Sequence, residues 1–224
     1  MRTVERAIAT FDQAFARDGI AIADELTGSL GRTDEANVIL KYAVSRDPVN
    51  SNNQFNLGLN YSSAGRWDEA IASLRTALSL SPGSIGAQSA IGDALLRQGK
   101  PDAALAAIQQ ESSEAFRLIG LAMAYHALGQ VAQSDAALAE LINKHEQGWA
   151  YNIAYVLAYR GEADRTFEWL DKAVQYKDPG LSEIPTQIEF TNIHDDPRWL
   201  PFLESIGKSP AQLDAIKFKV TLPE

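Results

Sequence analysis

The chain has 224 residues, of which 46% are hydrophobic and 22% are charged, a composition that excludes wholesale disorder and allows one large domain or two small ones. Its 29 acidic residues outnumber its 20 lysines and arginines, and the net charge of −9 disfavours a nucleic-acid partner because phosphates would repel it. Without cysteine, the chain has no disulfides, thiolate metal sites or cysteine nucleophiles.

The distribution of alanine and proline divides the chain into two parts. It has 34 alanines, but none lies between Val174 and Pro210, whereas six of its nine prolines follow Asp178. Because alanine costs least in a helix and proline interrupts one, we expect a helical body of roughly 175 residues and a differently built tail. No stretch approaches 18 consecutive apolar residues, and the N-terminus lacks a signal-peptide core. We therefore expect no membrane insertion and a cytoplasmic protein, or a periplasmic one if the chain belongs to a membrane-anchored parent.

Glycines recur along the body at spacings of 34, 34, 30 and 32 residues, at Gly31, Gly65, Gly99, Gly129 and Gly161. Residues 51–84 form the clearest unit. Leu57 and Tyr61 share one face of a first helix, Gly65 ends it, and Asp68 and Glu69 supply negative charge at the start of a second helix. Pro82 closes the unit because proline cannot continue a helix.

This unit resembles the tetratricopeptide repeat, a 34-residue helical pair. Eight positions match the pattern of that family: Leu57, Gly58, Tyr61, Gly65, Ala70, Leu74, Ala77 and Pro82. The resemblance implies an all-α fold, a right-handed α-solenoid of antiparallel helix pairs. We assign residues 1–179 to the array, with units near 1–19 (partial), 20–50, 51–84, 85–114, 115–146 and 147–179.

Three of these units depart from the pattern. Residues 1–19 match only a second helix, so either Val4–Arg17 is a capping helix or the chain is a piece of a longer protein. The first helix of the next unit, over 20–30, matches weakly. The unit over 85–114 is four residues short, about one helical turn, so the apolar face returns nearly in phase. We expect Glu111 and Glu114, in its polar connection, to face water.

Residues 180–224 are predicted to be a helical and extended cap, because the last repeat of a solenoid needs a cover. Asp195-Asp196-Pro197 resembles a helix cap followed by a first-turn proline, which would open a short helix carrying Trp199. A second short helix is expected to start at Ser209-Pro210 and to cover 212–216. An extended pattern then ends the chain, at Phe218, Val220 and Leu222.

The order of segments also resembles the C-terminal repeat regions of bacterial class III adenylate cyclases and winged-helix transcriptional regulators. The similar stretches are 124–129, 159–164 and 196–199. This resemblance implies a regulatory segment of a larger bacterial signalling protein. The chain contains neither a cyclase nor a DNA-binding domain, so the output activity of those proteins is not carried here.

The resemblance to tetratricopeptide repeats also implies a concave groove lined by the first helix of each unit. The expected peptide-binding residues are Phe55, Asn56, Leu59, Asp93, Arg97, Met123, His126, Tyr151, Asn152 and Tyr155. At their offsets, Asn56 and Asn152 would hydrogen-bond a bound peptide's backbone. Tyr151 and Tyr155 either grip a ligand or pack under the cap, and packing is the favoured interpretation of Tyr159. With only Arg97 as a cation, the groove lacks a carboxylate clamp.

We expect no enzyme, cofactor or metal site, because the three histidines are dispersed and no catalytic motif occurs. For His194-Asp195-Asp196, a helix cap is a better interpretation than a metal site. The first hypothesis is a non-enzymatic module that binds a protein or peptide in its groove. The alternatives are a self-associating scaffold, which would form a homodimer, and a small-ligand sensor with a closed pocket between groove and cap.

Overall fold

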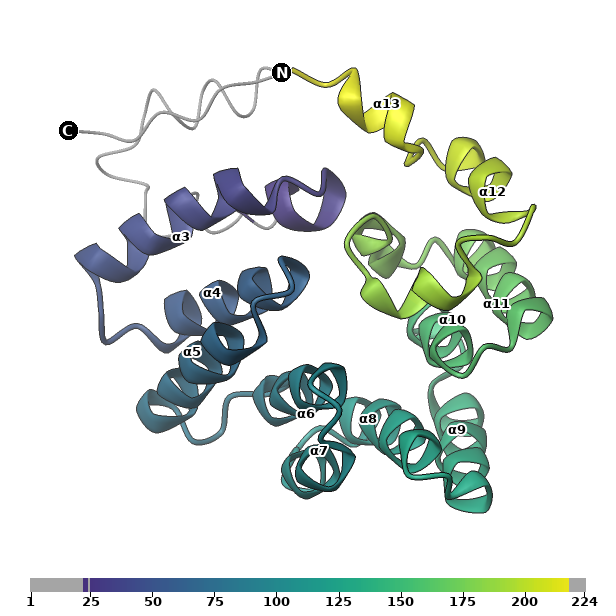
Figure 1. Cartoon of the computed structure of the whole chain (residues 1–224), viewed down its shortest axis with the longest axis horizontal. Coiled ribbons are helices and arrows are strands. Elements are labelled where there is room, and N and C mark those ends of the chain that lie inside the picture. Colours follow the sequence, from purple (N-terminus) through teal and green to yellow (C-terminus); the bar gives the residue numbers. More distant parts are fainter. Residues whose placement is uncertain (1–21, 24, 218–224) are drawn as a thin grey trace.

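The computed structural model describes residues 22–23 and 25–217, and within these ranges the chain forms helices and no strands. The predicted N-terminal helix over 4–17 and the extended pattern over 218–222 lie outside the described residues. Most of the helices form a curved array (Figure 1). The elements, in chain order, are η1 Glu25–Ser29, α3 Thr33–Arg46, α4 Ser51–Ser63, α5 Trp67–Leu80, α6 Ala87–Arg97, α7 Pro101–Ile108, α8 Glu114–Ala127, α9 Val131–His145, α10 Ala150–Tyr159, α11 Ala163–Tyr176, η2 Pro179–Glu183, η3 Ile188–Ile193, α12 Trp199–Ser205 and α13 Pro210–Asp214.

The helices pair in the order that the repeat predicts. Helices α4 and α5, α6 and α7, α8 and α9, and α10 and α11 form successive pairs, and the first helix of each pair also contacts the first helix of the next. The first helices α4, α6, α8 and α10 thus form the inner, concave layer (Figure 1). The all-α helical repeat fold predicted from the sequence is confirmed.

Small residues let the paired helices approach closely. A Cβ atom added to Gly58 would lie 2.7 Å from Cγ of Leu74, and one added to Gly92 would lie 2.3 Å from Cγ1 of Ile108. Both distances are shorter than van der Waals contact, so only glycine fits without moving the neighbouring helix. These contacts give the physical reason for Gly58 and Gly92, whereas Gly65 and Gly99 end their helices with left-handed φ angles of 72° and 70°.

The unit over 85–114, which is four residues short of the repeat, has a shortened second helix, α7. Helix α7 has 8 residues, whereas α5 and α11 have 14 each. The connection that follows it is not simply solvated, and the prediction for Glu111 is wrong: its side chain is buried, and its carboxylate accepts backbone N–H bonds from Ser89 at 3.3 Å and Ser113 at 3.0 Å. Ser89 lies in the first turn of α6, whose backbone N–H groups have no acceptor within the helix, and Ser113 lies in the connection; the Glu111 carboxylate accepts from both. Glu114 is partly exposed and pairs with Lys144 at 2.8 Å.

The C-terminal residues return to the start of the array. The Lys208 ammonium donates to the Ser29 carbonyl, and the Arg32 guanidinium donates to the Ile216 carbonyl, each at 3.0 Å. These two bonds join residues that are more than 175 positions apart along the chain. The described part of the chain therefore closes into a ring (Figure 1).

The two short helices of the tail exist, but the first starts later than predicted. Pro197 lies outside α12, which begins at Trp199, because Asp196 forms a turn instead: its carboxylate accepts the Arg198 N–H at 2.9 Å and also pairs with the Arg198 guanidinium. Helix α13 begins after Ser209, as expected, and ends at Asp214, two residues before the predicted end; a capping box joins Ser209 to Gln212.

Candidate binding site: a groove crossed by the chain's own strap

Residues 179–193, which contain η2 and η3 and are called the strap below, lie against the concave side of the array (Figure 1). The residue before it, Asp178, holds its start: one carboxylate oxygen accepts the Tyr151 N–H at 3.0 Å and the other accepts the Gly180 N–H at 2.9 Å. The Gly180 backbone packs directly against the Tyr151 ring, because a Cβ atom added to Gly180 would lie 2.4 Å from Cδ1 of that ring. The strap therefore begins in direct contact with helix α10.

Apolar anchors hold the rest of the strap. Ile184, Phe190 and Ile193 are each at most 2% exposed, and the Phe190 ring lies 5.8 Å from that of Tyr151 and 5.2 Å from that of Trp199. The Tyr151 hydroxyl reaches Gln187 at 3.4 Å. Tyr151 thus packs under the C-terminal segment, one of the two arrangements that the sequence left open.

A buried ionic cluster ties the strap to helix α6. The Glu189 side chain is 1% exposed and forms an ion pair with the Arg97 guanidinium, whose Nε lies 3.8 Å from Oδ1 of Asp93. The same guanidinium lies 5.2 Å from the centre of the Tyr159 ring. One cation therefore serves two carboxyl groups, one from the groove and one from the strap.

This cluster favours a proton on Asp93. Burial and the adjacent Glu189 raise the pKa of Asp93 well above its usual value of 3.8, although Arg97 opposes them. Burial lowers the pKa of Arg97, but Glu189 and Asp93 more than offset this, so the guanidinium remains charged. As a neutral acid, Asp93 can donate a hydrogen bond to the Glu189 carboxylate, which spreads one negative charge over the pair.

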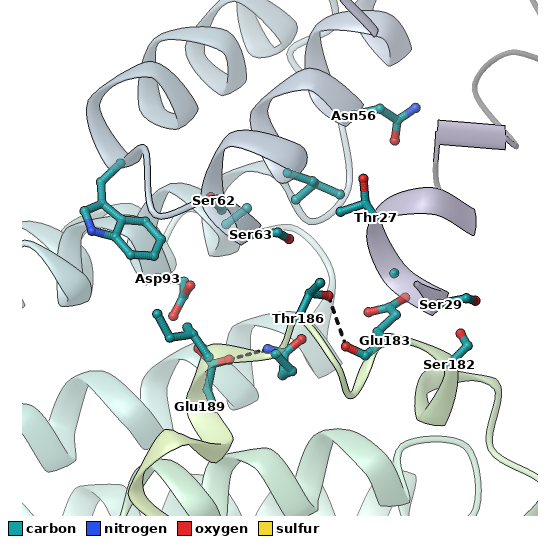
Figure 2. A pocket seen from close by; sticks show the side chains of 16 residues that line it. Thr27, Ser29, Asn56, Ser62, Ser63, Asp93, Ser182, Glu183, Thr186 and Glu189 are labelled. Atoms are coloured by element: carbon teal, nitrogen blue, oxygen red, sulfur yellow. Dashed lines mark hydrogen bonds between the residues drawn. The ribbon is translucent and has the colours of Figure 1, made fainter. Parts of the chain in front are cut away.

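Two pockets remain between the strap and the inner helices. The first, of about 510 Å³, is bounded by η1, α4, α6 and the strap, and is called the polar pocket (Figure 2). Its side chains include Thr27, Asn56, Ser62, Ser63 and Glu183, and the Asp93 carboxylate lies near Glu189 (Figure 2).

The second pocket, of about 430 Å³, is called the aromatic pocket because five rings line it: Phe55, Phe116, Trp149, Tyr151 and Tyr155. Six residues line both pockets, which therefore adjoin: Leu59, Ala90, Asp93, Glu183, Gln187 and Glu189. Both volumes fall in the range of small-molecule and side-chain sites, about 300–1,000 Å³.

Most of the residues predicted from the groove offsets surround these two pockets. Eight of the ten line one or both: Phe55, Asn56, Leu59, Asp93, Met123, Tyr151, Asn152 and Tyr155. Arg97 lies behind the pockets in the ionic cluster, and His126 is exposed with its ring 6.0 Å from that of Tyr159. Whether they bind a ligand stays a prediction.

Models of known families match a large part of the helical array. Three family models, each described as tetratricopeptide repeat, match residues 25–85, 61–116 and 118–147, which together make up more than half of the chain. The chain belongs to the tetratricopeptide repeat family. The comparison with curated proteins gives no match.

Solved structures support the same fold. TTC0263, a tetratricopeptide repeat protein of Thermus thermophilus, is 15% identical with a TM-score of 0.60 over 79% of this chain and 99% of its own. PilF of Pseudomonas aeruginosa is 14% identical, with a TM-score of 0.55 over 90% of this chain and 96% of its own. MamA from Desulfovibrio magneticus is 16% identical, with a TM-score of 0.50 over 73% and 95%. At these identities the likeness concerns the fold alone.

Several residues at the site of this tetratricopeptide array are not identifiable from the repeat pattern. Glu183, Gln187 and Glu189 belong to the strap, outside the repeats, and Trp149 lies one position before helix α10. The available signal was weak: Ile184, Phe190 and Ile193 are apolar residues in a tail that has no helical or strand period.

Neither a metal centre nor a membrane span is found among residues 22–23 and 25–217. No three His, Asp or Glu side chains in these ranges gather closely enough to hold an ion. His194 instead stacks on Trp199, with ring centres 5.1 Å apart, and burial lowers its pKa. None of the helices in these ranges is both long and apolar enough to cross a bilayer.

The raised pKa of Asp93 predicts a pH-dependent stability. A raised pKa in the folded protein contributes stability that is complete below about pH 4 and is lost as the pH rises through the raised value. The charged and titratable groups around Asp93 are Arg97, Glu183, Glu189, Tyr155 and Tyr159. Asp93→Asn keeps a donor toward Glu189 without titrating. Urea midpoints measured between pH 4.5 and 8 should fall more steeply for the natural protein than for the variant. Parallel curves would contradict this assignment.

Proposed function

We propose that the chain is a non-enzymatic protein-interaction module that binds a peptide or protein segment on its concave side. The observation that carries the proposal is that eight groove residues predicted from four different helices surround the same two adjoining pockets. Membership of a repeat family with such a groove supports it. The strap packs against helix α10, so a bound segment would share the concave side with it.

Peptide binding through this groove is testable with two asparagines that line it. We expect the double variant Asn56→Ala/Asn152→Ala to bind about tenfold more weakly, because each loses a hydrogen bond of about 0.5–1.5 kcal/mol to a peptide backbone. The probe is a dodecapeptide selected on the natural protein from a random phage library and then titrated by calorimetry, with helicity checked by circular dichroism.

The matched control is Asn52→Ala/Asn143→Ala, at two exposed positions that line neither pocket. Its affinity for the selected peptide should equal that of the natural protein. Equal binding by the Asn56/Asn152 variant would place the peptide elsewhere and overturn the groove assignment.

A small-molecule ligand is a second candidate, and the specific observation in its favour is the pocket space between the groove and the strap. The chain would then act as a sensor, with the strap forming one wall of the site. Thermal-shift screening against a metabolite collection should give at least one hit that Phe55→Ala abolishes. A collection without hits would argue against this candidate.

The wider context follows from the resemblances in the sequence. We propose that the module is a regulatory part of a larger bacterial signalling protein, as in the cyclases and winged-helix regulators whose repeat regions it resembles. Self-association into a homodimer rests on the incomplete unit over residues 1–19, outside the described part, and stays a prediction. Light scattering at high micromolar concentration tests it, and a strict monomer would contradict it.

A further inference from the structure

The described residues that line the two pockets supply acidic side chains and no basic ones. Three carboxyl groups line both pockets, those of Asp93, Glu183 and Glu189, whereas the described residues that line either pocket include no lysine, arginine or histidine. Arg97 is the neighbouring cation and pairs with both Asp93 and Glu189. Since Asp93 is held as a neutral acid and Arg97 balances Glu189, the remaining acidic groups are Glu183, which lines both pockets, and Asp178, which lines the aromatic pocket. An anionic ligand would therefore meet repulsion here, and a cationic one attraction.

We propose that the adjoining pockets bind a cationic group, an alkylammonium or guanidinium, carried by a lysine or arginine side chain of the bound segment. This inference rests on the proposed function and names the kind of peptide that the groove selects. A free amine offers the same chemistry, and the experiment below separates the two sources.

The walls of the aromatic pocket suit such a group. The Phe116 and Trp149 rings, both partly exposed, meet edge to face at 4.9 Å, so their orientations are fixed by each other. Aromatic faces attract ammonium and guanidinium groups, most strongly where water is excluded. The rings would also cover the methylene stem of a lysine or arginine, leaving its charged end to the carboxyl groups.

The carboxyl groups have an unused acceptor. Oδ1 of Asp93 is buried and accepts no hydrogen bond, because the nearest guanidinium nitrogen, Nε of Arg97, is 3.8 Å away. Figure 2 shows the Asp93 side chain pointing into the space between α4, α6 and the strap, close to Glu189. A buried acceptor without a donor costs free energy, and an entering N–H donor would remove that cost.

The two adjoining pockets together have room for a whole basic side chain. The pockets measure about 510 and 430 Å³ and are contiguous, so a long basic side chain can lie along the aromatic walls while its backbone stays near Asn56 and Asn152. Glu183 stands on the exposed side of the strap and lines both pockets, so it is placed to meet the cation first.

The test uses acetylated, amidated pentapeptides that differ only at the central residue. Peptides with lysine, arginine, norleucine or glutamate between alanines are titrated into the full chain by calorimetry, and spermidine is titrated separately. We expect lysine and arginine to bind about ten- to a hundredfold more tightly than norleucine, which has a similar stem without the charge, and glutamate not to bind.

The matching variants are Glu183→Gln, which removes one carboxylate from the pocket, and Glu168→Gln, which makes the same charge change at an exposed position of α11 outside it. Only Glu183→Gln should weaken lysine binding, about tenfold, while leaving the weak norleucine binding unchanged. Circular dichroism spectra identical to that of the natural protein show that both variants fold.

Each outcome decides between the two claims. Norleucine binding as tightly as lysine, or Glu183→Gln without effect, overturns the cation inference and leaves peptide binding intact. If spermidine binds and Glu183→Gln weakens that binding, while none of the peptides binds, the cation site is supported with a free amine as its ligand. The same result contradicts the peptide function. Binding of none of these probes overturns the cation inference, and the phage-selected peptide then decides the proposed function by itself.

Discussion

Replacing Arg97 with leucine is expected to lower the melting temperature by about 6–12 °C. The substitution leaves the Glu189 carboxylate, which is 1% exposed, without its cation, and uncompensated buried charge costs about 3 kcal/mol or more. In a chain of this length, each kcal/mol shifts the melting temperature by about 2–4 °C. Hydrogen exchange should also become faster in the strap, at the Phe190 amide, which donates to the Gln187 carbonyl at 3.3 Å.

Two further variants separate loss of the ion pair from loss of a side chain. Arg97→Leu/Glu189→Gln should recover much of the stability, because the charge left behind is removed as well. Arg75→Leu, at an exposed position of α5, should shift the melting temperature by no more than about 1 °C. If Arg97→Leu has the same melting temperature as the natural protein, the ionic cluster does not hold the strap in place.

Replacing Ile108 with alanine should cost about 2–5 kcal/mol. Ile108 is fully buried, and it is the large side chain that the short helix α7 inserts between Gly92 of α6 and Gly120 of α8. Because both glycines lack side chains that could fill the space, the cavity would persist and its cost would be high in this range. Urea unfolding followed by circular dichroism measures the loss.

The position of Ile108 also predicts how the variant unfolds. Helix α7 has only 8 residues, so weakening its contact should let the units before and after it unfold in separate steps, giving two urea transitions. The control Ile85→Ala, at a side chain that is 62% exposed, should keep one transition near the natural midpoint. One unshifted transition in Ile108→Ala would contradict the role assigned to this residue.

The sequence was sufficient wherever the structure depends on neighbours within one unit or the next. Gly58 and Leu74 are separated by 16 positions, and both stand at marked positions of the repeat, so their contact follows from the pattern. The start of α13 at Ser209-Pro210 is local in the same way. Short-range contacts leave a period or a fixed spacing in the sequence, and these can be recognised.

The strap could not be predicted because its contacts leave no such spacing. Arg97 stood out as the single cation of the expected groove, but its partner Glu189 lies 92 positions away in a segment without a period. Glu111 was expected to face water because its neighbours are polar, yet it is buried and accepts backbone N–H bonds from Ser89, in the first turn of α6, and from Ser113. Such long-range electrostatic and hydrogen-bond partners become visible only in three dimensions.

Closure of the ring changes how this array should fold. An open solenoid can nucleate at any unit and add neighbours one at a time, since each unit contacts only the next. Here the bonds from Lys208 to Ser29 and from Arg32 to Ile216 form only when nearly the whole described chain is in place. That late step has a large loop-closure entropy and raises the mean sequence separation of contacts, so folding should be slower than in an open array of equal length. In exchange, neither joined end is free to fray, and the number of repeats cannot change without opening the ring.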